Sequence, residues 1–255
     1  MMPFPPVDTV ADIERNLADV RGRIKSAAIR AGRDPAEVRL LPVTKTLPVE
    51  RLRSAVAAGC TELGENKVQE AKRKHAELAD LDVKWSVIGH LQTNKAKDVA
   101  TFAAEFQALD SVRVAEALDR RLAQTGRTLD VFVQVNTSGE ESKFGLSPED
   151  VPAFLSELPA FGSLRVQGLM TLALFSPDTE RVRACFRLLR ELRDRARDET
   201  PGLIGPGGLS MGMSGDFELA VEEGSTCVRV GQAIFGARAT PDSHYWPPTV
   251  SDGPT

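Results

Sequence analysis

This sequence is poor in the residues on which several large protein classes depend. Of its 255 residues, 5% are aromatic, three are cysteine and three are histidine. The cysteines (Cys60, Cys185 and Cys227) are far apart and form no Cys-x-x-Cys pair, so the sequence indicates neither a disulfide framework nor a zinc site. It also has no run of about 18 apolar residues, the length that a typical membrane-spanning helix needs.

An excess of positive charge is also missing. Lys and Arg number 32 against 36 Asp and Glu, and the resulting net charge of −4 argues against a general grip on nucleic acid. A run of arginines at 187–197 alternates with acids, which is typical of a solvated helix face. Residues 1–6 lack the pattern of a signal peptide. We expect a cytoplasmic protein that binds neither membranes nor nucleic acid.

Short apolar segments recur along the chain and predict eight β-strands. They lie at residues 39–44, 60–63, 85–88, 106–109, 131–135, 164–169, 209–211 and 227–230. Segments with helical apolar spacing alternate with them, beginning with a helix that Thr9 and Asp12 are expected to cap. At about 250 residues, eight such units predict an α/β fold, the (β/α)₈ or TIM barrel, with an additional N-terminal helix. An open doubly wound sheet is the alternative.

The barrel is expected to be one domain. No composition shift interrupts residues 1–238, which we therefore assign to it. Residues 239–255 contain four prolines and no apolar period, and we expect a mobile tail there.

Candidate functional residues follow the strands, because active residues of such barrels lie at the carboxyl ends. Lys45 follows the first strand, where desolvation would lower the pKa of its amine and free it to attack a carbonyl. The alternative is a lysine that extends to solvent. Small and hydroxyl residues from Ser210 to Ser214 follow the seventh strand, and Gly231 follows the eighth. Their loops predict a phosphate site, with Ser214 capping the next helix.

An amine and a phosphate site together describe a ligand with both a carbonyl and a phosphate. Pyridoxal phosphate fits this description, and so does the substrate of a sugar-phosphate aldolase. Arg229 alternates with apolar residues of the last strand and is expected to point into the barrel. There it would face a pyridine nitrogen or pair with an acid, for which Glu65, Asp110 and Glu222 are candidates.

Seven segments resemble, in order, the signature segments of one family. They are VTKT (43–46), LGENKVQE (63–70), IGHLQTNK (88–95), SKFG (142–145), GLM (168–170), LSMGMS (209–214) and VRVGQAIFG (228–236). Through them the chain resembles the pyridoxal phosphate homeostasis proteins, single-domain relatives of the alanine racemase barrel.

The resemblance implies that pyridoxal phosphate forms an internal aldimine with Lys45. It further implies that Ser210 and the backbone of Gly231 and Gln232 hold the phosphate, and that Arg229 faces the pyridine nitrogen. The remaining expected cofactor-binding residues are Asn66, His90, Met170 and Met211. Gln232 stands where the family commonly has a small hydroxyl residue, and Lys67 where it often has an aromatic residue or arginine.

The same resemblance bears on whether the protein carries the cofactor or catalyses a reaction with it. A racemase needs a second base opposite the lysine, but the only tyrosine, Tyr245, is in the expected tail, and His75 lies on the apolar face of a helix. An unprotonated pyridine opposite Arg229 is also a poor electron sink. We therefore expect a monomer that buffers pyridoxal phosphate and delivers it to apo-enzymes, with no catalytic or metal-binding residue. A racemase-like enzyme and, less favoured, a class I aldolase are the alternatives.

Overall fold

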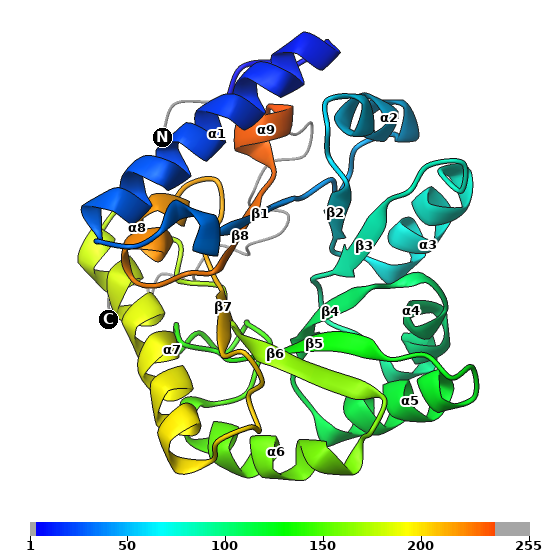
Figure 1. The fold of residues 1–255 in the computed structure, drawn as a ribbon, viewed down its shortest axis with the longest axis vertical. Helices are drawn as coiled ribbons and strands as arrows, with labels where there is room; N and C mark the ends of the chain where they lie inside the picture. The colour runs from blue at the N-terminus through cyan, green and yellow to red at the C-terminus, as the bar shows by residue number, and fades with distance from the viewer. Residues whose placement is uncertain (1–3, 238–255) are drawn as a thin grey trace, which may run out of the picture.

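The computed structural model describes residues 4–237, in which eight parallel strands form one sheet with helices around it (Figure 1). The strands are β1 (Arg39–Pro42), β2 (Glu62–Glu65), β3 (Lys84–Val87), β4 (Glu105–Leu109), β5 (Leu129–Gln134), β6 (Leu164–Met170), β7 (Gly208–Ser210) and β8 (Cys227–Val230). Their order is β1-β8-β7-β6-β5-β4-β3-β2. A parallel bridge between Val43 and Gly64 joins β1 to β2 and closes the barrel. The predicted (β/α)₈ barrel is confirmed.

Helices surround the barrel, α1 preceding the first strand and the others following the strands. They are α1 (Val10–Arg30), α2 (Val49–Ala57), α3 (Val68–Glu77), α4 (Ala96–Phe102), α5 (Val112–Ala123), α6 (Val151–Glu157), α7 (Thr179–Glu199), α8 (Phe217–Glu222) and α9 (Gln232–Phe235). Both faces of the sheet are covered, as parallel sheets require, and all residues of β4 and of β8 are buried.

The additional N-terminal helix α1 begins where the sequence predicts it. Thr9 and Asp12 form a reciprocal capping box, with the Asp12 amide donating to Thr9 Oγ1 at 3.1 Å. These contacts hold the pKa of the Asp12 carboxyl down at about 2. The helix lies across α8 and α9 (Figure 1). Asn16 donates to the carbonyl of Ile234 at 2.9 Å, so α1 supports α9, the short helix that follows β8.

Strand β2 lies further along the chain than the apolar pattern predicts, at Glu62–Glu65 instead of 60–63. The Cys60 amide donates to the carbonyl of Ala55, so this residue belongs to the turn after α2. Glu65 pairs with Val87 of β3 and is fully buried, which an apolar count cannot anticipate. The shift brings Asn66 directly to the carboxyl end of β2.

Two further predictions concern membrane-spanning helices and the C-terminal tail. No helix within residues 4–237 is long and apolar enough to cross a membrane. The predicted tail, residues 239–255, lies outside the described residues.

Candidate functional site

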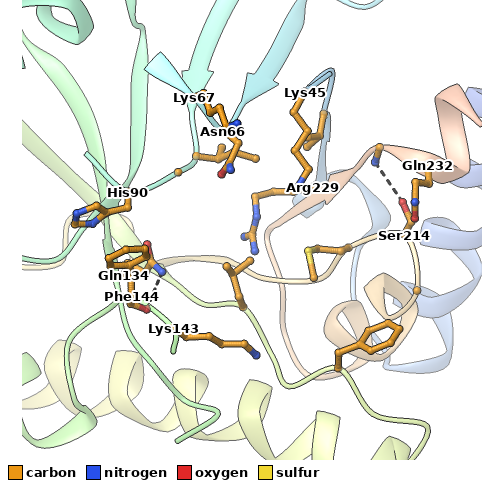
Figure 2. Close-up of a pocket in the computed structure, with 18 of the residues that line it drawn as sticks. Lys45, Asn66, Lys67, His90, Gln134, Lys143, Phe144, Ser214, Arg229 and Gln232 are labelled. Carbon is orange, nitrogen blue, oxygen red and sulfur yellow. Dashed lines mark hydrogen bonds between the residues drawn. The ribbon is translucent and has the colours of Figure 1, made fainter. Parts of the chain in front are cut away.

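A cavity of about 540 Å³ opens at the carboxyl ends of the strands, where the sequence places the candidate residues. Its volume lies in the range of about 300–1,000 Å³ that is typical of small-molecule sites. Figure 2 shows Asn66 and Arg229 directed toward its middle. His90 and Phe144 lie on one side of them, and Ser214 and Gln232 on the other.

Lys45 lines this cavity from the tight turn that follows β1. It is half-buried, and the backbone of the next residue, Thr46, has a φ of 68°. The Thr46 amide donates to Glu70 Oε1 of α3 at 2.8 Å. The turn therefore places the Lys45 side chain at the cavity, and the hydrogen bond from the Thr46 amide to Glu70 fixes the backbone of the turn.

Asn66 and Gly89 share a close contact at the ends of β2 and β3. A Cβ atom on Gly89 would lie 2.1 Å from the backbone oxygen of Asn66 and 2.3 Å from its Oδ1. Only glycine leaves room for this approach. Gly89 therefore allows Asn66 to lie along the cavity wall, a role that the sequence analysis did not assign to it.

Arg229 enters the cavity wall from β8 as a buried cation. Its Nη1 donates to Ser210 Oγ at 2.6 Å, and its Nη2 donates to the carbonyl of Thr171 at 2.7 Å. Burial lowers the pKa of the Arg229 guanidinium, although an arginine still keeps its proton at neutral pH.

Among the described residues, no acid lies within ion-pair distance of Arg229, so the alternative in which it pairs directly with an acid is not supported there. The three candidate acids have other cationic or histidine partners among the described residues. Glu65 pairs with Lys74, Glu222 with Arg30 and Arg183, and Asp110 with His90.

A chain of hydrogen bonds continues from Arg229 through the barrel interior. Ser210 Oγ donates to Gln107 Oε1 at 2.7 Å, and Gln107 Nε2 donates to Glu105 Oε2 at 2.6 Å. Glu105 in turn accepts from Arg39 Nη2 at 2.8 Å near the opposite end of the barrel. The guanidinium at the cavity is therefore held by Ser210 of β7 and by the Thr171 carbonyl, and Ser210 and Gln107 connect it by hydrogen bonds to the Glu105 carboxylate.

Two backbone amides converge on Ser214 at the opposite side of the cavity. Gly231 N–H donates to Ser214 Oγ at 3.3 Å, and Ala233 N–H donates to the same oxygen at 3.2 Å. Ser214 was expected to cap α8, but this is wrong, because Asp216 occupies the N-cap position and accepts from the Met213 amide at 2.6 Å. The loop after β7 and the turn after β8 thus form one polar cradle.

An aromatic pair borders the other side of the cavity. The rings of His90 and Phe144 stack with centroids 3.9 Å apart, and His90 Nδ1 lies 3.4 Å from Asp110 Oδ2. Burial raises the pKa of the Asp110 carboxyl. Gln134 Nε2 donates to the carbonyl of Phe144 at 2.9 Å and holds this loop (Figure 2). Phe144 itself is 57% exposed, so the pair lies at the cavity mouth.

Positive charge predominates among the residues that line the cavity. The basic residues are Lys45, Lys67, Lys95, Lys143 and Arg229. Asp216 is the one carboxylate in the described lining, and burial raises its pKa. In a protein of net charge −4, this arrangement favours an anionic ligand at this place.

The chemistry of this cavity agrees with comparisons to known proteins. The family model described as alanine racemase, N-terminal domain, matches residues 13–239. The chain belongs to this family.

The chain's relatives within the family define its branch. It is 45% identical to the pyridoxal phosphate homeostasis protein of Pseudomonas aeruginosa, a match that covers 90% of this chain and 97% of that one. It is 40% identical to the protein of the same name from Aquifex aeolicus, over 87% and 96% of the two chains. The chain therefore belongs to the pyridoxal phosphate homeostasis proteins, as the resemblance predicts.

Solved structures agree with both the fold and the family. PipY of Synechococcus elongatus with pyridoxal phosphate bound has a TM-score of 0.77 and 34% identity, and covers 88% of this chain and 100% of its own. The same protein without pyridoxal phosphate has a TM-score of 0.79. Alanine racemase of Streptomyces lavendulae is 19% identical with a TM-score of 0.69, over 92% of this chain and 59% of its own, which shows the fold alone.

Within this family member, the expected site residues divide into two groups. Those that line the cavity are Lys45, Asn66, His90, Arg229, Gly231 and Gln232. Those that are buried and are not part of the described lining are Met170, Ser210 and Met211. The Ser210 hydroxyl, expected to contact the phosphate, is hydrogen-bonded to Gln107 and Arg229 inside the barrel.

The structure adds Phe144 to the site, and it places Ser214 of the predicted phosphate loop in the cavity lining instead of at the cap of α8. Phe144 and Ser214 both belong to signature segments, so the signal was present in the sequence. Lys67, unassigned from the sequence, is exposed and lines the cavity. His75 lies elsewhere, stacked on Phe102 with ring centroids 5.3 Å apart, as its apolar helix face predicts.

Proposed function

We propose that this protein binds pyridoxal phosphate covalently through Lys45, keeps the reactive aldehyde from stray amines, and delivers the cofactor to apo-enzymes. The observation that carries the proposal is that one cavity combines a lysine amine, a polar cradle of backbone amides and a buried guanidinium. Family membership supports the same cofactor.

The phosphate fits the cradle formed by Ser214, Gly231 and Ala233. The two backbone N–H groups already converge on one oxygen atom, the Ser214 hydroxyl. A phosphate oxygen is a stronger acceptor than a hydroxyl, and charge-assisted hydrogen bonds of this kind are the stronger class. We assign the hydroxyl contact to Ser214 in place of Ser210.

The pyridine ring fits beside Arg229. A guanidinium has only donors, so it accommodates an unprotonated ring nitrogen and disfavours a protonated one. When bound, pyridoxal phosphate supplies an electrophilic carbonyl carbon, but with an unprotonated ring it supplies a weak electron sink. Ser210 and Thr171 fix the guanidinium in place, while Asn66 borders the cavity between Arg229 and β3.

The cavity favours storage of the cofactor over turnover of an amino acid. His90, a lining residue with an imidazole base, is stacked on Phe144 and faces Asp110. That arrangement holds the imidazole at the mouth of the cavity, away from the role of a second base. We further propose that the carrier acts as a monomer and meets apo-enzymes transiently.

The test uses the visible absorption of the full-length protein with added pyridoxal phosphate. Wild-type protein is expected to develop an absorption band that Lys45→Ala lacks, and borohydride reduction followed by peptide mass analysis is expected to find the cofactor on Lys45. Lys97→Ala, an exposed lysine change on α4, is the control and should retain the band.

Three assays then distinguish a carrier from a racemase and from an aldolase. Loaded wild-type protein is expected to activate an apo-enzyme that depends on pyridoxal phosphate. Solvent deuterium appearing at the α-carbon of an amino acid would instead establish a racemase. A colourless protein whose Lys45 is trapped by borohydride with a sugar phosphate would establish an aldolase.

A further inference from the structure

A buried charged cluster lies behind the turn that carries Lys45. Lys74 of α3 is fully buried, and its Nζ lies 2.8 Å from Glu65 Oε1 and 2.7 Å from Glu70 Oε1. Buried ion pairs contribute little net stability, because desolvation of the charges offsets their attraction, and apolar residues often replace them without loss. The cluster therefore calls for a role other than stability.

Its contacts lead to both neighbours of Lys45. Lys74 Nζ donates to the carbonyl of Thr44 at 2.8 Å, and Thr44 Oγ1 donates to Glu65 Oε1 at 2.6 Å. On the other side, the Thr46 amide donates to the same Glu70 oxygen that contacts Lys74. One ammonium group thus connects the residue before Lys45 with the residue after it.

The backbone at this point needs such support. Thr46 is the one non-glycine residue with a positive φ among the described residues, at 68°. Threonine is β-branched, and the left-handed region is unfavourable for such side chains. The conformation persists where surrounding contacts fix it, and the hydrogen bond from the Thr46 amide to Glu70 is such a contact.

We propose that Glu65, Glu70 and Lys74 form a positioning cluster that fixes the backbone around Lys45 and so directs its amine into the cavity. The inference rests on the proposed function of Lys45. These residues do not take part in any reaction themselves. They act through Thr44 and Thr46, the two residues that flank the lysine.

The test compares two substitutions at Glu70, whose side chain is 20% exposed and so tolerates change better than its buried partners. Glu70→Gln keeps an oxygen that can accept from the Thr46 amide and from Lys74, whereas Glu70→Ala removes it. Glu77→Ala is the matched control, because Glu77 lies on the same helix and pairs only with exposed Arg73 in the described contacts. Affinity for pyridoxal phosphate and the fraction of cofactor trapped on Lys45 by borohydride are measured in full-length protein below its unfolding temperature.

Glu70→Ala is expected to bind pyridoxal phosphate roughly fivefold more weakly, because a factor of this size corresponds to the net contribution of about one hydrogen bond. The fraction trapped on Lys45 should fall in parallel, while Glu70→Gln and Glu77→Ala stay within about twofold of wild type. Equal affinity of Glu70→Ala and Glu77→Ala would overturn the proposal, as would a Glu70→Gln variant as weak as Glu70→Ala. If wild-type protein itself fails to bind, the proposed function fails, and that outcome is distinct from these.

Discussion

Ser210, the last residue of β7, and Ser214, four residues later, have different hydrogen-bond partners, and substitutions can distinguish their roles. Ser214→Ala removes a hydroxyl from the cavity cradle and is expected to weaken pyridoxal phosphate binding about fivefold with little change in stability. Ser210→Ala removes the hydrogen-bond partner of Arg229 Nη1 and of Gln107 Oε1 and is expected to lower the free energy of unfolding by about 1–3 kcal/mol. Urea denaturation and absorbance titration measure the two effects.

The control for both variants is Ser156→Ala, because that hydroxyl is exposed and, in the described contacts, donates only to the Pro152 carbonyl of its own helix. It should leave affinity and stability unchanged. The assignment of the cradle fails if Ser210→Ala weakens binding while Ser214→Ala does not.

The strand-end rule was sufficient to find Lys45 from the sequence, and alternation with apolar residues along the last strand was sufficient to find Arg229. It could not place Ser210. That hydroxyl is bound by Gln107, 103 residues earlier in the chain, and only the closed barrel brings the two together. Sequence spacing predicts which end of a strand a residue occupies, but not which partner is within reach of its side chain.

Among the elements, β6 depends on a single glycine where it meets β7. Gly168 has a φ of 154°, and a Cβ there would lie 1.9 Å from the backbone oxygen of Gly208. The register between β5 and β6 also shifts here, since Phe132 pairs with Gly168 directly after Val131 pairs with Val166. Gly168→Ala is therefore expected to lower the free energy of unfolding by roughly 3 kcal/mol or more.

Gly162→Ala is the matched comparison, because nothing lies within 4 Å of a Cβ at that position. Its free energy of unfolding should stay within about 0.5 kcal/mol of wild type. Similar unfolding curves for the two variants would show that β6 and β7 can move apart without cost.

The apolar residues of a segment were sufficient to predict that it forms a strand, but they did not predict the residues at which the strand begins and ends. The β2 segment illustrates the reason, since Gly64 and Glu65 extend the strand although neither is a typical strand residue. Glu65 can be buried there because Lys74, nine residues later, supplies its counter-charge. The apolar pattern of a short segment does not show that a buried acid will have such a partner.

For the molecule as a whole, charge is distributed unevenly, with a negative total and a basic cavity. Such a field draws an anionic ligand toward the cavity, and salt screens it over a Debye length of about 10 Å at 0.1 M ionic strength. Raising sodium chloride from about 20 to about 200 mM is therefore expected to slow association with pyridoxal phosphate severalfold, as measured by stopped-flow absorbance.

Local charge at the cavity, and not net charge, should set this salt dependence. A Lys67→Gln/Lys95→Gln variant removes two cavity charges and is expected to associate more slowly and to respond less to salt. A Lys25→Gln/Lys84→Gln variant changes the net charge equally, but these exposed lysines lie on α1 and at the amino end of β3, outside the described cavity lining. Equal salt slopes for the two variants would mean that total charge alone governs encounter, whereas a smaller slope only for the first assigns that role to the barrel mouth.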